Sequence, residues 1–240
     1  MSLHTITQLQ SKTLTTYFSN TPILSHISTY MGFIASKEQH LFSAYRLRHQ
    51  VYCEELNWQP KHNRRLEIDK FDNYATTICV ASKEGNVVAT IRLLDESQNW
   101  LVDDSFPNTL THSSKHLRMN GYIEASRLAI CPNMRNVPIY SSGTTALDLL
   151  LITLINYAWD YLGKKNVLIT TTPLMAVILK RRGVAIEQAG EIITMEDNCK
   201  VASYLCHLEV SRDQYRHYNN YMNRQQVAVP KENVVSRIAV

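Results

Sequence analysis

Three arginines stand where the sequence pattern otherwise places apolar side chains. A helical projection of the stretch YRLRHQVYCEELNW puts Arg48 on the apolar face with Leu41 and Tyr45, and Arg92 and Arg127 interrupt the runs VVATIRLL and YIEASRLAI. An arginine keeps its charge, so burying it is unfavourable unless anions or carbonyl oxygens meet its donors. A single case is most simply a side chain that reaches from the rim into water, but three favour a shared internal site for an anion or carbonyl group.

Carboxylates gather in the stretch LEIDKFDNY, where Glu67, Asp69 and Asp72 lie within six residues. Such a density of negative charge could hold an ammonium group, although a loop with several carboxylates is most often simply solvated. The stretch lacks the glycine that a calcium loop of the EF-hand type requires, so we exclude that site and expect no metal.

Glu124 precedes Arg127 by three residues in the run YIEASRLAI. In a regular strand the two side chains would point to opposite faces, so a shared pocket requires a β-bulge between them. Among apolar neighbours the pKa of a carboxyl group rises and the group can act as a general base, whereas a nearby arginine opposes that shift. The pattern leaves two interpretations of Glu124 open, a catalytic base or an outward-facing strand residue.

The elements that must position these residues begin with a predicted helix over residues 38–56. An antiparallel pair of strands follows at residues 76–82 and 86–94, joined by the turn KEGN, and a third strand covers residues 122–130. Each chemically interesting residue therefore lies on, or next to, a well-patterned element.

The second half of the chain carries clear helix signals. Thr145 and Asp148 have the spacing of a capping box at the start of a helix that Gly163 ends. Thr172 then caps a second helix after the strand KNVLITTT, and a hairpin around EDNC closes the pattern. This order of elements predicts an α+β fold with a central, twisted, mixed and mostly antiparallel sheet flanked by helices.

Length and composition suit one globular domain. The chain has 240 residues, of which 45% are hydrophobic, and this is enough for a single substantial core. We predict a domain over residues 38–210, with an amino-terminal extension at residues 1–37 and a tail at residues 211–240. The net charge of +4 is too small to predict nucleic-acid binding and is compatible with an acidic protein partner.

The cysteines and the apolar segments indicate the compartment. Five cysteines without paired or metal-ligand spacing favour free thiols in a reducing environment. The first twenty residues have no apolar run behind a basic start, and the most apolar helix carries aspartates, so we expect neither a leader nor a transmembrane segment. We expect a cytoplasmic protein.

Taken in order, these residues resemble a known family. The series formed by Arg48, Tyr52, Trp58, the E-x-D-x-x-D run, Arg92, Phe106 and the E-x-S-R run is similar to that of the acyl-homoserine-lactone (autoinducer) synthases, which share a GNAT-like acyl-CoA N-acyltransferase fold. The phrases RLRHQVYCEE, FP and EASRLAI also resemble the exosortase-associated (PEP-CTERM) acyltransferases and the N-acyl amino acid synthases. The resemblance covers residues 38–210 and rests on the ordered set, since no single motif is specific.

The resemblance implies an N-acyltransferase that moves a fatty acyl group to the amino group of an amino-acid-type acceptor. It implies catalytic roles for Glu124, Arg127 and Arg92, and substrate binding by Arg48, Tyr52, Trp58, Asp69, Asp72 and Phe106, to which we add Thr171. Autoinducer synthases usually have phenylalanine in place of Tyr52, while the sister group often lacks a tryptophan at Trp58. The acceptor therefore stays open between an amino acid and S-adenosylmethionine, the latter with lactone closure. A non-catalytic acyl-binding or regulatory module is an alternative of a different class.

The acyl donor can be predicted from one loop. Relatives that use coenzyme A generally have a glycine-rich pyrophosphate loop, but here the corresponding stretch NMRNVPIYSSGTTALD has only Gly143. We therefore expect acyl carrier protein as the donor and no resident cofactor. The acidic surface of a carrier protein would meet Lys180, Arg181 and Arg182, although such runs also occur as solvated helix ends.

Overall fold

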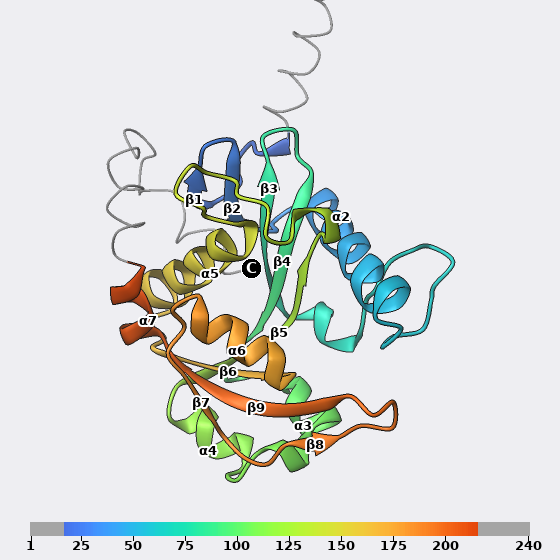
Figure 1. The fold of residues 1–240 in the computed structure, drawn as a ribbon, viewed down its shortest axis with the longest axis vertical. Coiled ribbons are helices and arrows are strands. Elements are labelled where there is room, and N and C mark those ends of the chain that lie inside the picture. Colours follow the sequence, from blue (N-terminus) through green and yellow to red (C-terminus); the bar gives the residue numbers. More distant parts are fainter. Residues whose placement is uncertain (1–16, 216–240) are drawn as a thin grey trace, which may run out of the picture.

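A nine-stranded sheet organises residues 17–215, the part of the chain that the computed structural model describes (Figure 1). The order is β1-β2-β3-β4-β5-β6-β9-β7, with β8 paired to β9, and only β5 and β6 run parallel. The mixed, mostly antiparallel sheet that the sequence predicts is confirmed. The strands are β1 (Ile23–Ile27), β2 (Tyr30–Ile34), β3 (Thr76–Ser82), β4 (Val87–Leu94), β5 (Tyr122–Ile130), β6 (Asn166–Thr171), β7 (Ile186–Gln188), β8 (Ile193–Thr194) and β9 (Lys200–His207).

Helices cover both faces of the sheet. The helix α5 packs against β1, β3 and β4 on one face, and α2 packs against β3, β4 and β5 on the other (Figure 1). The helices are α2 (Glu38–Arg48), α3 (Leu101–Ser105), α4 (Ser114–Met119), α5 (Ala146–Asn156), α6 (Pro173–Arg181) and α7 (Leu208–Gln214). Two of them continue as π-helical segments, α2 as η1 (His49–Glu55) and α5 as η5 (Tyr157–Tyr161), and short 3₁₀ turns are η2 (Lys70–Asn73), η3 (Pro107–Thr109) and η4 (Pro132–Met134).

The predicted helix signals are confirmed. Thr145 and Asp148 form the expected capping box of α5, and the Thr172 side chain accepts a hydrogen bond from the backbone N–H of Met175 at the start of α6. The chain reverses after η5 at Gly163, whose φ of 65° lies in the left-handed region that favours glycine.

Two boundaries differ from the prediction. Residues 23–34, expected to belong to an amino-terminal extension, instead form β1 and β2, and β2 pairs along its whole length with β3. At the other end, β9 stops at His207 and α7 follows, so the folded unit continues past residue 210. The remaining parts of the predicted extension and tail, residues 1–16 and 216–240, lie outside the described residues.

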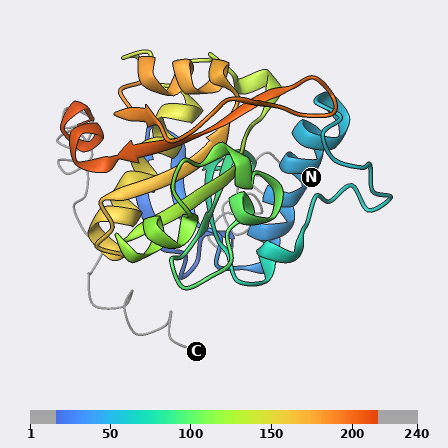
Figure 2. The same cartoon turned by 90° about the horizontal axis from the view of Figure 1, so that it is seen from below.

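The sheet opens between β5 and β6. The two strands pair only as far as Ala125 and Ile169, after which β5 continues with β4 and β6 continues with β9. The opening coincides with a bulge in β5, where the partners of Thr90 and Arg92 are separated by one extra residue and Arg127 has a φ of 54°. The sequence analysis made a bulge the condition for one pocket shared by Glu124 and Arg127; the pairing stays regular from Glu124 to Ser126, and the bulge lies at Arg127 and Leu128. The long strand β9, orange-red in Figure 2, runs beside β6 across this end of the molecule.

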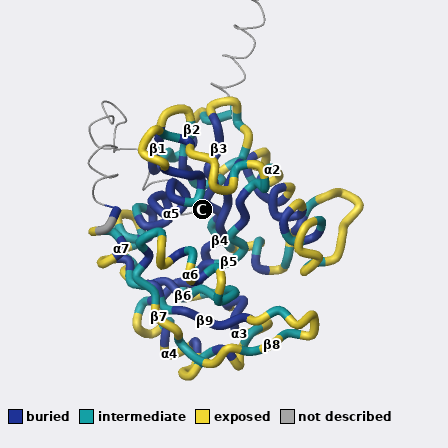
Figure 3. The backbone as a smooth tube through the Cα atoms, viewed as in Figure 1, coloured by how far each residue is buried: buried dark blue, intermediate teal, exposed yellow. Residues whose placement is uncertain are grey.

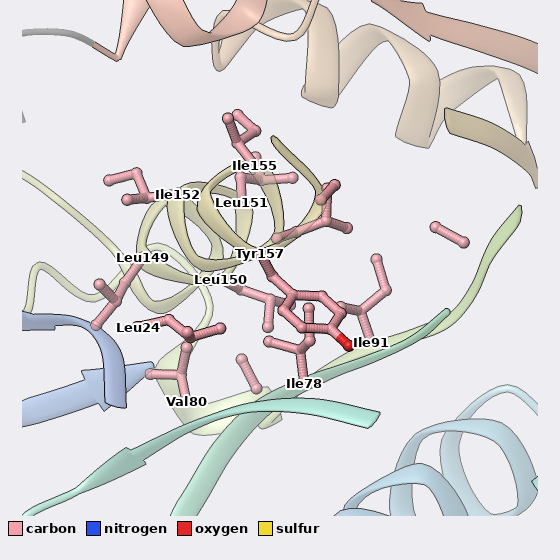
Figure 4. Close-up of a cluster of buried hydrophobic side chains, with 14 of the residues drawn as sticks. Leu24, Ile78, Val80, Ile91, Leu149, Leu150, Leu151, Ile152, Ile155 and Tyr157 are labelled. Atoms are coloured by element: carbon pink, nitrogen blue, oxygen red, sulfur yellow. The ribbon is translucent and has the colours of Figure 1, made fainter. Parts of the chain in front are cut away.

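The main core lies between the sheet and α5. Leucines and isoleucines of α5 pack on Ile78 and Val80 of β3 and on Ile91 of β4 (Figure 4). The buried stretches form a continuous layer through β3, β4, β5 and α5, while the loops around them are exposed (Figure 3). A smaller core under α3 packs around Trp100 and Leu94 on the opposite face of the sheet.

Candidate active site

Arg48 is buried in an ion network. Its side chain is 1% exposed; Nε lies 2.5 Å from Glu67 Oε2, and the two terminal nitrogens donate to the two oxygens of Asp72 at 2.7 and 2.9 Å. Burial lowers the pKa of a guanidinium, but here the hydrogen bonds with Asp72 and the charge of Glu67 outweigh it and raise the pKa of Arg48. The arginine that projects from the apolar face of the helix is thus met by two carboxylates.

The other two arginines complete the network. Arg92 Nη1 lies 2.5 Å from Asp69 Oδ1 and its Nε donates to Ser126 Oγ at 3.0 Å. Arg127 donates from Nε to Glu67 at 3.0 Å and from Nη2 to Asp69 at 2.9 Å. Three positive and three negative charges therefore meet in one place, which reduces the cost of burying each of them.

The acidic loop is held in one conformation. Asp69 accepts a hydrogen bond from the backbone N–H of Phe71, and Asp72 accepts one from the backbone N–H of Asp69, which makes a capping box at the start of η2. Burial alone would raise the pKa of Asp72, but the hydrogen bonds and charge of Arg48 lower it, so this carboxyl group stays ionised. Its side chain is 2% exposed and that of Asp69 is 21% exposed, so Asp69 keeps an accessible edge.

Glu67 is a member of this network that the sequence analysis did not assign to the site. It joins Arg48 to Arg127, two residues that are far apart in the sequence. The sequence feature that could have assigned Glu67 to the site was its position as the first residue of the E-x-D-x-x-D run.

A cavity of about 550 Å³ passes through the opening of the sheet. Tyr52, Trp58 and Arg127 line its polar end. The Tyr52 and Trp58 ring centroids are 6.2 Å apart, and the Tyr52 hydroxyl donates to the backbone carbonyl of Leu128 at 2.7 Å. Burial raises the pKa of Tyr52 to about 12, so its hydroxyl stays protonated and keeps η1 attached to the bulge of β5.

The other end of the cavity is apolar. It lies against α5 and α6, and Thr171 is part of its wall where β6 ends. The apolar lining consists mainly of Leu147, Leu151, Leu154, Ile155, Val167, Ile169, Met175, Ile178, Leu179, Val184 and Leu208.

Several predicted site residues do not belong to the residues that line this cavity, namely the ion-network members Arg48, Asp69, Asp72 and Arg92, and also Phe106 and Glu124. Glu124 is 1% exposed, and its two carboxylate oxygens accept the backbone N–H groups of Leu101 and Val102 at 2.6 and 2.9 Å, at the start of α3. Burial raises its pKa to about 7 despite these hydrogen bonds. Phe106 packs in the same region, against the core around Trp100. The structure therefore does not place Phe106 in an aromatic wall with Tyr52, and a proton from the cavity reaches Glu124 only if one of these hydrogen bonds is exchanged.

The basic run at the end of α6 divides into two parts. Lys180 and Arg181 are exposed, whereas Arg182 donates to Asp148 Oδ2 at 2.8 Å. Asp148 also accepts from the backbone N–H and the hydroxyl of Thr145, so its carboxylate occupies the amino terminus of α5. Arg182 is thus tied to the core of the fold, and Thr145 is not free to bind a phosphate.

A family model described as autoinducer synthase matches residues 33–217. The chain belongs to the autoinducer synthase family. The acyl-homoserine-lactone synthase of Enterobacter agglomerans is 27% identical over 159 residues, 64% of this chain and 69% of that protein. The acyl-homoserine-lactone synthase of Dickeya chrysanthemi is 26% identical over 186 residues, 76% of this chain and 83% of that protein.

Solved structures confirm the GNAT-like fold. The AHL synthase LasI superposes with a TM-score of 0.61 at 20% identity, over 77% of this chain and 91% of that one. FeeM, an N-acyl amino acid synthase from uncultured soil microbes, superposes with a TM-score of 0.57 at 15% identity, over 79% of this chain and 96% of that one. As a member of the autoinducer synthase family, the chain is an acyltransferase.

No helix within residues 17–215 is long and apolar enough to cross a membrane. Nor do the histidine, cysteine and acidic side chains of this range form a group of three or more that could hold a metal ion.

Proposed function

We propose that this autoinducer synthase transfers a fatty acyl group from acyl carrier protein to the amino group of S-adenosylmethionine and releases an acyl-homoserine lactone after ring closure. The observation that carries the proposal is the cavity through the opening between β5 and β6, which is apolar at one end and aromatic and charged at the other. A thioester seated in the opening would have its chain on one side of the sheet and the acceptor on the other.

The apolar end suits an acyl chain. Its walls are leucine, isoleucine, valine and methionine side chains of β6, α5 and α6, and its volume falls in the range of about 300–1,000 Å³ that is typical of small-molecule sites. Burial of a methylene group contributes about 0.8 kcal/mol, so chain length would be selected by how far the chain fills this end.

The aromatic end suits a cationic acceptor. Ring faces carry negative potential, and Tyr52 and Trp58 line this end of the cavity together with Arg127, whose Cζ lies 5.6 Å from the Tyr52 ring centroid. The arginines themselves are occupied by Glu67, Asp69 and Asp72, which supports a bracing role for them. Asp69 does not belong to the residues that line the cavity, but it is the most exposed of the three carboxylates, and we propose it as the one that attracts the positive charge.

The reaction needs a neutral amine that attacks the thioester carbonyl while its proton leaves. The C–S bond of the thioester breaks and the carrier thiol departs; the acceptor's carboxylate then attacks its own γ-carbon, the C–S bond to the sulfonium breaks, and methylthioadenosine departs. Glu124, with a pKa of about 7, is suited to receive the amine proton through a water that exchanges with its backbone partners.

The donor proposal rests on the amino terminus of α5. A pyrophosphate favours a helix amino terminus with free N–H groups, but here Asp148 already occupies that position with a negative charge. The exposed Lys180 and Arg181 supply cations for an acidic carrier. Because the solved structure of BjaI is described as a CoA-dependent acyl-homoserine lactone synthase, with a TM-score of 0.61 at 17% identity, both donors must be measured.

Purified full-length protein, incubated with a matched acyl group on carrier protein or on coenzyme A, tests the proposal. S-adenosylmethionine and a panel of amino acids serve as acceptors, and mass spectrometry identifies the products. We expect equal amounts of acyl-homoserine lactone and methylthioadenosine, with faster turnover from the carrier-bound donor. An acylated amino acid without methylthioadenosine would refute the proposed acceptor.

One feature favours that second candidate, an N-acyl amino acid synthase. Tyr52 lines the polar end of the cavity and adds a hydroxyl where relatives of the lactone-forming group usually have phenylalanine. FeeM, an N-acyl amino acid synthase, also shares the fold. The same product analysis distinguishes the two activities.

A further inference from the structure

Two buried hydroxyl groups, of Thr109 and Ser203, form a hydrogen-bonded chain with the hydroxyl of the half-buried Thr170, which lies in the wall of the cavity. Thr109 Oγ1 lies 2.6 Å from Ser203 Oγ, and Ser203 Oγ lies 2.8 Å from Thr170 Oγ1. Thr109 and Ser203 are both fully buried, and Thr170 lines the cavity beside the opening of the sheet. The chain therefore connects the 3₁₀ turn η3, on one side of β9, with the candidate active site.

The hydrogen bond of Thr109, at the buried end of this chain of hydroxyl groups, fixes which oxygen donates in each of the other two hydrogen bonds. Thr109 Oγ1 donates to the backbone carbonyl of Phe106 at 2.6 Å, and a carbonyl oxygen can only accept. Since a hydroxyl has one proton, the Thr109–Ser203 bond must use the proton of Ser203, and the Ser203–Thr170 bond must use the proton of Thr170. The hydroxyl of Thr170, a residue of the cavity wall, therefore has its proton already engaged with Ser203.

An oxygen of this kind is only a hydrogen-bond acceptor. It cannot serve as a proton acceptor through the chain either, because the chain ends at a carbonyl group that does not take up a proton.

The segments around these hydroxyl groups are held firmly. The Thr111 N–H donates to Ala189 at 3.0 Å, and a Cβ atom at Gly190 would lie 2.2 Å from the Thr109 carbonyl oxygen, so η3 and the segment before β8 are in close contact.

The register places Thr170 on the acceptor side of the sheet. Thr170 follows Ile169, the last residue of β6 that pairs with β5, and strand alternation therefore puts it on the same face as Ser126. Ser126 accepts a hydrogen bond from Arg92, so this face is the one that carries the ion network. Thr170 thus stands at the opening, opposite to the face where α5 and α6 form the apolar end.

We infer that the Thr170 hydroxyl oxygen accepts an N–H of the acceptor's amino group and turns the nitrogen lone pair toward the thioester. The inference rests on the proposed function, whose acceptor carries such an amine. The other reacting groups, a thioester carbonyl and a carboxylate, present only acceptors, so the amine is the group that a committed hydroxyl oxygen can recognise in the opening. Thr170 is accordingly a residue that determines specificity for a primary amine.

Equilibrium binding by calorimetry to the full-length protein tests this role with two probes. S-adenosylmethionine carries the amino group, and methylthioadenosine lacks it. We expect Thr170→Val to weaken binding of S-adenosylmethionine about tenfold and to leave binding of methylthioadenosine unchanged. A tenfold loss corresponds to about 1.4 kcal/mol, the size of one net hydrogen bond. Thr170→Ser, which keeps the oxygen, is expected to bind both probes like the parent.

A second variant tests the direction of the chain without changing the cavity wall. Ser203→Ala removes the acceptor for the Thr170 proton, so that the Thr170 hydroxyl is free to donate and its preference for an N–H partner falls. We expect weaker binding of S-adenosylmethionine, by about threefold to tenfold, with methylthioadenosine again unaffected.

The outcomes separate the inference from the function. If the parent binds neither probe, the proposed acceptor is refuted and the inference falls with it. If the parent binds S-adenosylmethionine and Thr170→Val binds it equally well, the inference alone is overturned. If Thr170→Val binds both probes equally more weakly and also has a lower melting temperature, the inference is overturned as well. That result would show that the hydroxyl chain only stabilises the fold.

Discussion

At the scale of single residues, the geometry of the ion network explains why three arginines can be buried together. Each guanidinium has two or more carboxylate or hydroxyl contacts, and Glu67, Asp69 and Asp72 each contact two arginines. Planar, bidentate partners suit arginine and do not suit lysine, whose ammonium is a compact point charge. The network therefore depends on the shape of the side chain as well as on its charge.

Arg48→Lys is expected to destabilise the protein by about 1.5–3 kcal/mol, the typical contribution of a hydrogen bond to a charged group, because lysine cannot contact Glu67 and both oxygens of Asp72 together. Urea unfolding measures the change. Arg46→Lys, at an exposed position of the same helix, is the matched control. Equal stability of the two variants would show that the network does not brace the acidic loop.

Glu124→Gln is expected to change the pH dependence of stability. The folded-state pKa of Glu124 is raised by burial from 4.5 to about 7, so its contribution is complete below the unfolded value and is lost as the pH rises through about 7. Between pH 5 and pH 8 the parent should therefore lose about 2–3 kcal/mol more than the variant. Unfolding titrations at several pH values measure this difference.

The same variant tests catalysis at Glu124. A general base contributes about 100- to 10,000-fold, so Glu124→Gln should lose most acyl transfer while still folding. Glu191→Gln, an exposed position, is the control for both measurements. A loss below tenfold would leave Glu124 with only its role as the partner of the α3 backbone.

At the scale of elements, α6 links the acyl end of the cavity to the proposed carrier-binding surface. Its inner residues Met175 and Ile178 line the cavity, while Lys180 and Arg181 are exposed at its end. Arg182 is bound to Asp148 and is unsuitable as a probe of docking, because its removal would leave a buried carboxylate without its partner.

The double variant Lys180→Glu and Arg181→Glu should lower kcat/KM for the carrier-bound donor by about tenfold or more and change little for the coenzyme A donor. The effect should shrink as salt is added, since the screening length is about 8 Å at physiological ionic strength and shorter above it. Lys83→Glu with Lys115→Glu, at exposed positions elsewhere, controls for net charge. If both double variants behave alike, the end of α6 is an ordinary solvated terminus.

The elements with strong local signals were predictable. The caps of α5 and α6, the helix from Glu38 and the strands β3 to β6 follow hydrophobic spacing and turn chemistry. The strands β1 and β2 were missed because they have five residues each and turn through Ser28, whose φ of 55° is a position where sequence usually shows glycine or asparagine. The helices α3 and α4 are similarly short, and no pattern marked them.

The charged residues of the ion network stood out in the sequence, but their contacts could not be predicted, and neither could the positions of Glu124 and Phe106 away from the cavity lining. The three arginines and the acidic run were identified because charged residues interrupted apolar patterns. Their pairing was not, because which carboxylate meets which arginine depends on how α2 packs against β4 and β5. The same holds for Glu124, whose strand position was clear but whose partners, the first residues of α3, belong to a helix that the sequence did not indicate.

At the scale of the whole molecule, the opening of the sheet joins the two halves of the site. The bulge at Arg127 turns one arginine into the ion network and bends β5 away from β6. The cavity then has walls from α5 and α6 on one face and from η1 on the other. A single bulge in β5 thus allows the acyl chain and the acceptor to bind on opposite faces of the sheet and to meet in the opening between β5 and β6.

The ion network should also couple the activity of the enzyme to the folding of the whole domain. Its six charges come from four segments: the helix α2, the loop that precedes β3, the strand β4 and the strand β5. If one of these segments detached, buried charges would lose their partners, which is strongly unfavourable. Catalytic competence should therefore arise only when the last segment docks and vanish with the first that leaves. In a urea titration, the loss of activity and the loss of circular dichroism should follow one curve; inactivation at a clearly lower urea concentration would reveal a partly loosened site.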